Sequence, residues 1–217
     1  LGCAGCNLTV QEGEISVLMG LSGSGKSTLL RAVNLLNVPV RGHVYVKDGA
    51  EAVDVVHCDE ATLRRIRQKH VAMVFQQFAL LPWRTVEENV GFGLELAGVP
   101  EKERKERVAG QLSLVGLDQW AKKYAHELSG GMRQRAALAR ALVSEPAYLF
   151  LDEPFASLDE ITRERLGDLL LSVRATRRPT TLLVTHSVVE AVRLADRVLV
   201  LSPRPARIVA DVRIDLD

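Results

Sequence analysis

The sequence predicts an α/β protein with a mainly parallel sheet, an inserted helical segment and a small antiparallel β element. Three observations lead to this fold class. Short apolar runs alternate with segments of helical periodicity at both ends of the chain, the middle is helical throughout, and a tight turn joins one pair of alternating segments. With 217 residues, the chain is long enough to bury the core of one such domain.

The first strand is expected at 14–19, an apolar run that follows Gly13. A glycine-rich turn at 20–25 then leads into segment 26–36, whose apolar residues recur on one face of a helix. Strand, glycine-rich turn and helix in this order predict the first unit of a parallel sheet.

A hairpin is expected next, because Asp48-Gly49 is typical of the turn between two antiparallel strands. The strands that it joins are predicted at 43–47 and 52–56. A basic amphipathic helix at 59–68 and a buried strand at 71–75 follow.

The middle of the chain changes character and carries only helical patterns. Segments 85–96 and 101–115 are separated by Gly98-Val99-Pro100, and a further helix is expected at 130–142. We interpret 78–145 as a helical subdomain inserted in the core rather than a separate domain.

Strands and helices alternate again after the insertion, which predicts a parallel sheet covered by helices on both faces. The strands are expected at 148–151, 180–185 and 197–201, the helices at 162–174 and 188–194, and a closing edge strand at 207–214. The whole chain, 1–217, is therefore predicted to form one domain.

The charge balance gives no general reason to bind nucleic acid or an anionic membrane surface. Lys and Arg together number 28 and Asp and Glu 27, for a net charge of +1. No apolar run approaches the roughly 20 residues of a membrane helix. Any association with a membrane is therefore expected to go through a partner.

Three cysteines are present, and Cys3 and Cys6 form a C-x-x-C pair. Such a pair is compatible with a metal or redox role, but no second pair at zinc spacing accompanies it. Packing near a strand is the favoured interpretation, and the odd count is typical of a reducing cytosol. Because the chain begins with Leu1 rather than Met, we expect a segment upstream.

The turn after the first strand fits the phosphate-binding pattern G-x-x-x-x-G-K-[ST]. Its glycines let backbone amides point at phosphate oxygens, and the following helix start adds partial positive charge. Lys26 is expected to reach the β- and γ-phosphates and the Ser27 hydroxyl to bind Mg²⁺. The predicted nucleotide-binding residues here are Gly20, Leu21, Ser22, Gly23, Ser24, Gly25, Lys26, Ser27 and Thr28.

The strand at 148–151 runs into two acids, Asp152 and Glu153. Asp152 is expected to hold Mg²⁺ and Glu153 to polarise the attacking water. Acids at strand ends also occur as solvated turn residues, but the phosphate loop in the same chain favours the catalytic interpretation.

With these residues, the chain resembles the ATP-binding cassette (ABC) ATPases, a family with the RecA-like P-loop NTPase fold. Leu128-Ser129-Gly130-Gly131-Met132 resembles the family's signature motif, with Met132 where Gln is most usual. Val74-Phe75-Gln76 resembles the Q-loop, Ser157-Leu158-Asp159 the D-loop, and His186 the switch histidine. The motifs occur in the family's order, and the resemblance covers essentially the whole chain.

The resemblance implies ATP and Mg²⁺ as the bound groups. The resemblance also implies that the family's catalytic residues correspond to Glu153, His186 and Gln76. The family's metal ligands correspond to Ser27, Gln76 and Asp152. Ser129, Gly130, Gly131 and Asp159 are implied to contact nucleotide, the first three at a helix start that suits a phosphate.

The implied partners follow from the same resemblance. The phosphate at Ser129-Gly130-Gly131 belongs to ATP on a second subunit, so a head-to-tail homodimer is expected. Integral-membrane permease subunits, and indirectly a solute-binding protein, are the further partners, and nucleic acid is not one. The chain is thus expected at the cytoplasmic face of the plasma membrane, held there by the permease.

One departure from the family concerns the adenine. The family places an aromatic residue some two dozen residues before the phosphate loop to stack on the base. Only nineteen residues precede Gly20 here, and none is aromatic. The stacking residue is therefore expected to lie upstream or to be replaced.

Two solute classes compete in the resemblance. The chain resembles choline and glycine-betaine importer ATPases at 20–34, 75–89 and 123–127. It resembles nitrate, sulfonate, taurine or pyrimidine-precursor importer ATPases at 132–135, 155–163 and 201–209. We favour choline or glycine betaine, with the nitrate, sulfonate and taurine class as the alternative.

Two rivals from other classes fit less well. A non-transport ABC ATPase acting on nucleic acid or ribosomes is disfavoured by the neutral charge and the absence of long basic arms. A P-loop protein without turnover is disfavoured because Lys26, Glu153 and His186 are intact.

The loop at 76–89 is more apolar than a solvated loop needs, with Phe78, Leu80, Leu81, Pro82 and Trp83. Either it packs onto the helical insertion, or it forms a docking cleft for a cytoplasmic helix of a permease.

Overall fold

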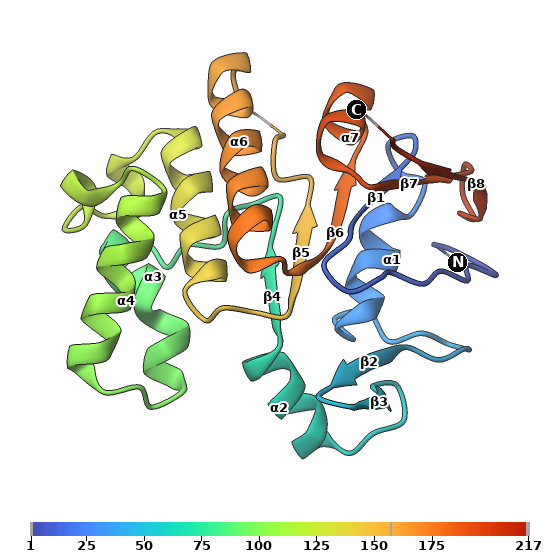
Figure 1. The fold of residues 1–217 in the computed structure, drawn as a ribbon, viewed down its shortest axis with the longest axis horizontal. Helices are drawn as coiled ribbons and strands as arrows, with labels where there is room; N and C mark the ends of the chain where they lie inside the picture. Colours follow the sequence, from blue (N-terminus) through green and yellow to red (C-terminus); the bar gives the residue numbers. More distant parts are fainter. Residues whose placement is uncertain (1, 157, 216–217) are drawn as a thin grey trace.

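A six-stranded sheet forms the centre of the computed structural model, which describes residues 2–156 and 158–215. The strand order is β4-β5-β6-β1-β7-β8, and helices stand on both sides (Figure 1). The strands are β1 Ile15–Met19, β4 Val71–Val74, β5 Tyr148–Asp152, β6 Thr180–Thr185, β7 Arg197–Leu201 and β8 Ile208–Arg213. All neighbours are parallel except β7 and β8, which confirms the mainly parallel sheet with an edge strand at the C-terminal end.

Seven α-helices are assigned to the described residues. They are α1 Lys26–Val33, α2 Glu60–Lys69, α3 Val86–Leu96, α4 Glu101–Leu114, α5 Gly130–Leu142, α6 Glu160–Arg177 and α7 Val188–Leu194. Two single turns of 3-10 helix, Asp118–Trp120 and Ala125–Glu127, connect α4 to α5. None of the helices in the described part of the chain has the length and apolar character that crossing a bilayer requires.

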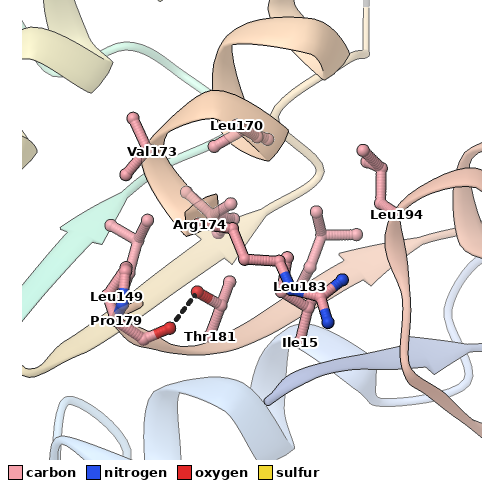
Figure 2. Close-up of a pocket in the computed structure, with 10 residues that line it drawn as sticks. Ile15, Leu149, Leu170, Val173, Arg174, Pro179, Thr181, Leu183 and Leu194 are labelled. Atoms are coloured by element: carbon pink, nitrogen blue, oxygen red, sulfur yellow. Dashed lines mark hydrogen bonds between the residues drawn. The ribbon is translucent and has the colours of Figure 1, made fainter. Parts of the chain in front are cut away.

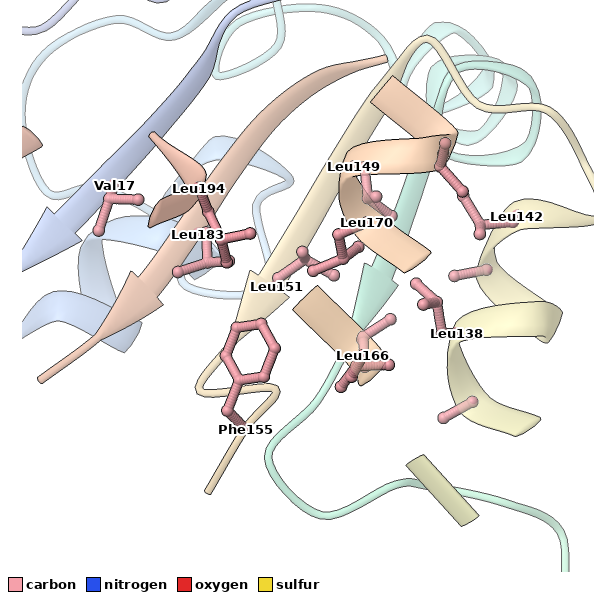
Figure 3. Packing of buried hydrophobic residues seen from close by; sticks show 14 of the residues in the cluster. Val17, Leu138, Leu142, Leu149, Leu151, Phe155, Leu166, Leu170, Leu183 and Leu194 are labelled. Atoms are coloured by element: carbon pink, nitrogen blue, oxygen red, sulfur yellow. The ribbon is translucent and has the colours of Figure 1, made fainter. Parts of the chain in front are cut away.

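Alternate residues of the central strands face two different cores, as the two-residue period of a strand requires. Leu149, Leu151 and Leu183 point to the face covered by α5, α6 and α7 (Figure 3). Phe150 and Leu182 point to the opposite face, where α1 covers them. Burial on both faces explains why these strands read as continuous apolar runs.

We expect Leu183→Ala to lower the free energy of unfolding by about 2–5 kcal/mol, because it leaves a cavity among close-packed side chains. Leu183 is 1% exposed in the core of Figure 3. The matched control is Val189→Ala on α7, where the side chain is 74% exposed and the change should stay within about 0.5 kcal/mol. Urea unfolding of both variants measures the difference, and equal losses would place Leu183 outside the core.

A second core lies within the helical insertion. Apolar residues of α3, α4 and α5, among them Val90, Leu112 and Ala136, are buried against one another there. Thr85 begins α3 with a capping box, since its side chain and that of Glu88 each accept the other's backbone amide. Ser129 caps α5 through the Met132 amide.

The predicted hairpin is present, but its first strand begins two residues later than the sequence predicts. β2 spans Tyr45–Asp48, β3 spans Glu51–Asp54, and the turn is Gly49-Ala50, with Gly49 at a φ of 66°. β3 ends at Asp54 because the side chain of Asp54 accepts the backbone amide of Val56 and turns the chain.

Two helices also differ from the predicted bounds. α1 ends at Val33 instead of 36, since Leu35 adopts a φ of 54° and Arg67 donates to the carbonyls of residues 34 and 35. α6 is longer than 162–174 because Asp159 caps it from Glu160. In contrast, α5, β6, α7 and β7 have the predicted bounds.

A cavity of about 10 Å³ lies between α6 and the sheet (Figure 2). Its lining is mostly apolar, and the Thr181 hydroxyl beside it already donates to the Pro179 carbonyl at 3.0 Å. A space this small holds at most one water molecule. It is therefore a packing gap, and any ligand site has to lie elsewhere.

Candidate functional site

The parallel register brings the carboxyl ends of four strands to one edge of the sheet. Val74, Leu151, Leu183 and Val17 form one row across β4, β5, β6 and β1. Gln76 and Glu153 lie two residues beyond that row, and Gly20 and His186 lie three residues beyond it. Segments far apart in the sequence therefore meet at this edge, which is where ligands bind in open α/β sheets.

The loop between β1 and α1 requires glycine at two positions. Gly25 has a φ of 117°, and a Cβ placed on it would lie 2.4 Å from the Gly2 carbonyl oxygen. A Cβ on Gly20 would lie 2.9 Å from the Leu201 carbonyl oxygen. The backbone is thus packed closely on both sides of the predicted phosphate loop.

Lys26 begins α1 and is 4% exposed. Its Nζ donates to the carbonyl oxygens of Gly20 and Leu21, each at 2.9 Å, so the ammonium lies within the loop. The buried Ser24 hydroxyl has no hydrogen-bond partner among the described residues. A buried cation and an unpartnered buried hydroxyl in one loop are what a phosphate group would satisfy.

Asp152 ends β5 and is 1% exposed. Ser27 Oγ donates to its Oδ1 at 2.6 Å, and Arg31 donates to its Oδ2 through Nε at 3.1 Å and Nη2 at 2.8 Å. A hydroxyl and a carboxylate side by side are the oxygen ligands that Mg²⁺ takes, so the residues fit that ion.

The sequence reasoning missed Arg31. A signal was present, because Ser27 and Arg31 are four residues apart and therefore share one face of α1. The guanidinium donates through two nitrogens to one oxygen of Asp152, Oδ2, which leaves Oδ1 facing Ser27.

Glu153 lies at the centre of the three predicted catalytic side chains. Gln76 Nε2 donates to Glu153 Oε2 at 3.4 Å, and His186 Nδ1 lies 3.8 Å from the same oxygen. The backbone of Glu153 has a φ of 49°, a strained conformation for a residue with a Cβ. The Glu153 side chain is 19% exposed and that of His186 65%, so the group opens to solvent.

The other predicted nucleotide contacts lie together in a second place. Asp159 caps α6 by accepting a hydrogen bond from the Thr162 backbone amide at 3.0 Å. Hydrogen bonds from the side chain and from the backbone amide of Thr162 hold the pKa of Asp159 below its usual value. A Cβ on Gly131 would lie 2.5 Å from Thr162 Cγ2, so the start of α5 packs against the start of α6. Ser129 is exposed there, while Ser157 of the D-loop-like motif lies outside the described residues.

These two places are separated in the fold. α5 stands beside α3 and α4, whereas α1 stands on the far side of β5 and β6 (Figure 1). One copy of the chain therefore holds the phosphate loop and the Ser129–Gly131 segment on different elements, without bringing them together.

The N-terminal segment lies against the phosphate loop. A Cβ on Gly2 would lie 2.9 Å from Thr28 Cγ2, and the Ala206 amide donates to the Gly2 carbonyl at 3.1 Å. Cys3 and Cys6 pack against the core on the α1 face, and Cys6 Sγ donates to the Ala206 carbonyl. Burial raises the pKa of the Cys3 thiol, which suits the packing interpretation better than a reactive one.

Comparison with known proteins places the sequence among transport ATPases. Residues 3–156 match the family described as ABC transporter. The glycine betaine/proline betaine transport system ATP-binding protein ProV of Escherichia coli is 45% identical over 201 residues, which cover 93% of this chain and 49% of ProV. The taurine import ATP-binding protein TauB of Rhizobium johnstonii is 43% identical over 208 residues, covering 96% of this chain and 74% of TauB.

A solved structure agrees in fold. It is a dimeric post-hydrolysis state of an ATP-binding cassette bound to ADP and Pi, with a TM-score of 0.88 and 31% identity over 100% of this chain and 92% of that one. The chain spans about half the length of the betaine-type curated relatives that it matches. The family match covers more than half of the chain, and the chain therefore belongs to the ABC transporter family.

Proposed function

We propose that this chain binds ATP with Mg²⁺ and hydrolyses it in a head-to-tail pair, driving solute import through membrane permease subunits. The observation that carries the proposal is the arrangement at the sheet edge. Lys26 lies in the phosphate loop, Ser27 contacts Asp152, and Glu153 lies between Gln76 and His186.

Each side chain has a chemical task in this proposal. Lys26 leaves its two carbonyl partners and neutralises phosphate oxygens, while Ser27 and Asp152 hold Mg²⁺. The bound ion supplies charge neutralisation at the phosphates. Glu153 accepts a proton from the attacking water, which Gln76 orients, and His186 contacts the γ-phosphate.

Pairing of two copies completes the site in this proposal. Ser129, Gly130 and Gly131 begin a helix whose amides and partial positive charge suit an anion, and they lie away from the phosphate loop of their own chain. A second copy, turned head to tail, brings its own Ser129–Gly131 segment to that loop. The dimeric solved relative supports this pairing.

The most direct test of pairing alters the Ser129 segment and the phosphate loop in separate copies. Equal mixtures of Lys26→Met and Ser129→Arg chains should form one site with both defects and one intact site, recovering activity that each variant lacks alone. The readout is phosphate release from ATP in the mixture. No recovery, with both variants folded and able to associate, would sink the head-to-tail proposal.

Arg31 acts as a positioning residue for Asp152 in this account. We expect Arg31→Met to raise the Mg²⁺ concentration needed for half-maximal hydrolysis about 5–50-fold, with a smaller effect on the rate at saturating Mg²⁺. Arg31→Lys should recover only part of the affinity, because an ammonium cannot make both contacts. A Mg²⁺ titration at fixed ATP checks this, and an unchanged requirement would remove the role.

A permease is the proposed membrane partner, and the loop before α3 is its proposed docking surface. Phe78 and Leu80 of that loop pack against the core, as one of the two interpretations of the loop predicts. Trp83 is 71% exposed and remains available for a partner helix. Arg84 pairs with Glu95 at 2.7 Å, so a probe at position 83 is used beside one at position 84.

A cross-linker at position 83 or 84, in a chain with its cysteines changed to Ser, is expected to capture the permease in assembled membranes. A probe at Lys105 on α4 serves as the control. Failure at 83 and 84 across several linker lengths would remove the docking surface. Success would also place the chain at the cytoplasmic face of the membrane, held there by the permease.

The proposed solute is a quaternary amine such as glycine betaine or choline. The ProV relative supports this class, and the TauB relative supports taurine-type solutes as the alternative. The ATPase does not touch the solute, so the solute has to be identified in the assembled transporter. Faster ATP hydrolysis with a binding protein loaded with glycine betaine, and not with taurine, is expected, and the reverse result would favour the alternative.

A further inference from the structure

Two histidines and an aspartate meet on the β2–β3 hairpin. The hairpin lies at the opposite end of the molecule from the arrowheads of β5 and β6, so it is separate from the sheet edge (Figure 1). His43 precedes β2, Asp54 ends β3, and His57 lies in the turn that follows. Within the described residues, this is the one group of three or more His, Cys, Asp or Glu side chains whose ligand atoms converge.

Both histidines contact the same carboxylate oxygen of Asp54. His43 Nδ1 lies 2.6 Å and His57 Nδ1 2.8 Å from Asp54 Oδ2. All three ligand atoms lie within 4.8 Å of one another, and the two imidazole centroids are 5.0 Å apart. The two ring nitrogens therefore converge on one carboxylate oxygen.

The hairpin backbone holds Asp54 in place. Its Oδ1 accepts the amides of Val44 at 3.3 Å and Val56 at 3.1 Å, which leaves Oδ2 for the histidines. The Tyr45 ring stacks on the His43 ring.

We propose that His43, Asp54 and His57 bind a late first-row divalent cation, with Zn²⁺ as the favoured ion. Two imidazole nitrogens and one carboxylate oxygen are ligands that Zn²⁺ takes, and a water molecule completes a tetrahedral set. Mg²⁺ and Ca²⁺ require oxygen ligands and do not suit this set.

Binding needs only a small rearrangement. A tetrahedral zinc ion holds neighbouring ligand atoms about 3.3 Å apart. The contacts of His43 and His57 with Asp54, at 2.6 and 2.8 Å, therefore have to open by about 0.7 and 0.5 Å. Each Nδ1 also has to present its lone pair, with the proton carried on Nε2. The His43 and His57 side chains are 57% and 62% exposed, so the rings have room to turn.

The ion would link the segment that precedes β2 to the segment that follows β3. His43 lies before β2 and His57 after β3, so a metal between them closes both strands at their open end. The hairpin packs through Val46 and Val55 against Ile66 of α2. Binding should therefore raise the melting temperature of the chain as the zinc concentration rises.

The test is a calorimetric titration of Zn²⁺ without nucleotide, in a chain carrying Cys3→Ser and Cys6→Ser to remove the rival thiols. One site is expected, and His43→Gln or His57→Gln should each weaken it about tenfold or more. The matched controls are His70→Gln, which removes a histidine paired with Asp48 at 2.9 Å, and His126→Gln. Neither control should change the affinity by more than about twofold.

The native chain provides a second measurement that does not depend on the folding of variants. Zn²⁺ should protect His43 and His57 from acylation by diethyl pyrocarbonate, while His126 stays reactive and Mg²⁺ gives no protection. Absence of zinc binding, or a site equally strong without either histidine, would show that the cluster only forms hydrogen bonds.

Discussion

Replacing Glu153 by Gln is expected to lower the rate of ATP hydrolysis about 10²–10⁴-fold and to leave the affinity for ATP within about threefold. The amide keeps the size of the side chain and removes the base. The carbonyl oxygen of the new Gln side chain can still accept the hydrogen bond of the Gln76 amide. Single-turnover phosphate release and a separate ATP titration measure the two quantities.

The matched control for this prediction is Glu101→Gln, a change at the exposed start of α4. It should leave both quantities within about twofold. A Glu153→Gln chain that turns over ATP near the wild-type rate would show that another group takes the proton. In that case, the grouping of Gln76 and His186 around this carboxylate would not be the catalytic arrangement.

Replacing Lys26 by Met is expected to weaken ATP binding about 10–150-fold, the range for losing a hydrogen-bonded charged partner. Lys26 is 4% exposed, so Met fills nearly the same buried space without the charge. The carbonyls of Gly20 and Leu21 lose their donor, but they lie at a loop that solvent can reach. The fold is expected to persist.

Calorimetric titration of ATP into Lys26→Met measures the loss, and an unfolding curve checks that the chain remains folded. The control is Lys47→Met on the hairpin, whose ammonium pairs with Glu12 at 3.1 Å on the surface. Equal ATP affinity in the wild type and in Lys26→Met would mean that the loop does not bind the phosphates.

Elements with an unambiguous local pattern could be predicted from the sequence. β6 is buried along its whole length and α5 begins at a Ser cap, and both have the expected bounds. The phosphate loop and the pair Asp152 and Glu153 were also recognisable, because their spacing is set within one short segment.

Features that depend on contacts between distant segments could not be predicted. α1 stops early because Arg67, from another helix, binds the carbonyls at its end. The contact of Arg31 with Asp152 joins residues 121 positions apart, and the sequence shows only that Arg31 shares a helix face with Ser27. The packing of Gly131 on Thr162, and the meeting of His43 with His57 across the hairpin, likewise appear only once the chain is folded.

Hydrolysis by a head-to-tail pair can be measured as phosphate release from ATP over a range of chain concentrations, with and without Mg²⁺. We expect Mg²⁺-dependent release whose rate per chain rises with concentration, because each phosphate loop needs the Ser129–Gly131 segment of a second copy. A folded chain that binds ATP but releases no phosphate at any concentration, or releases it at a constant rate per chain, would rule out hydrolysis by such a pair.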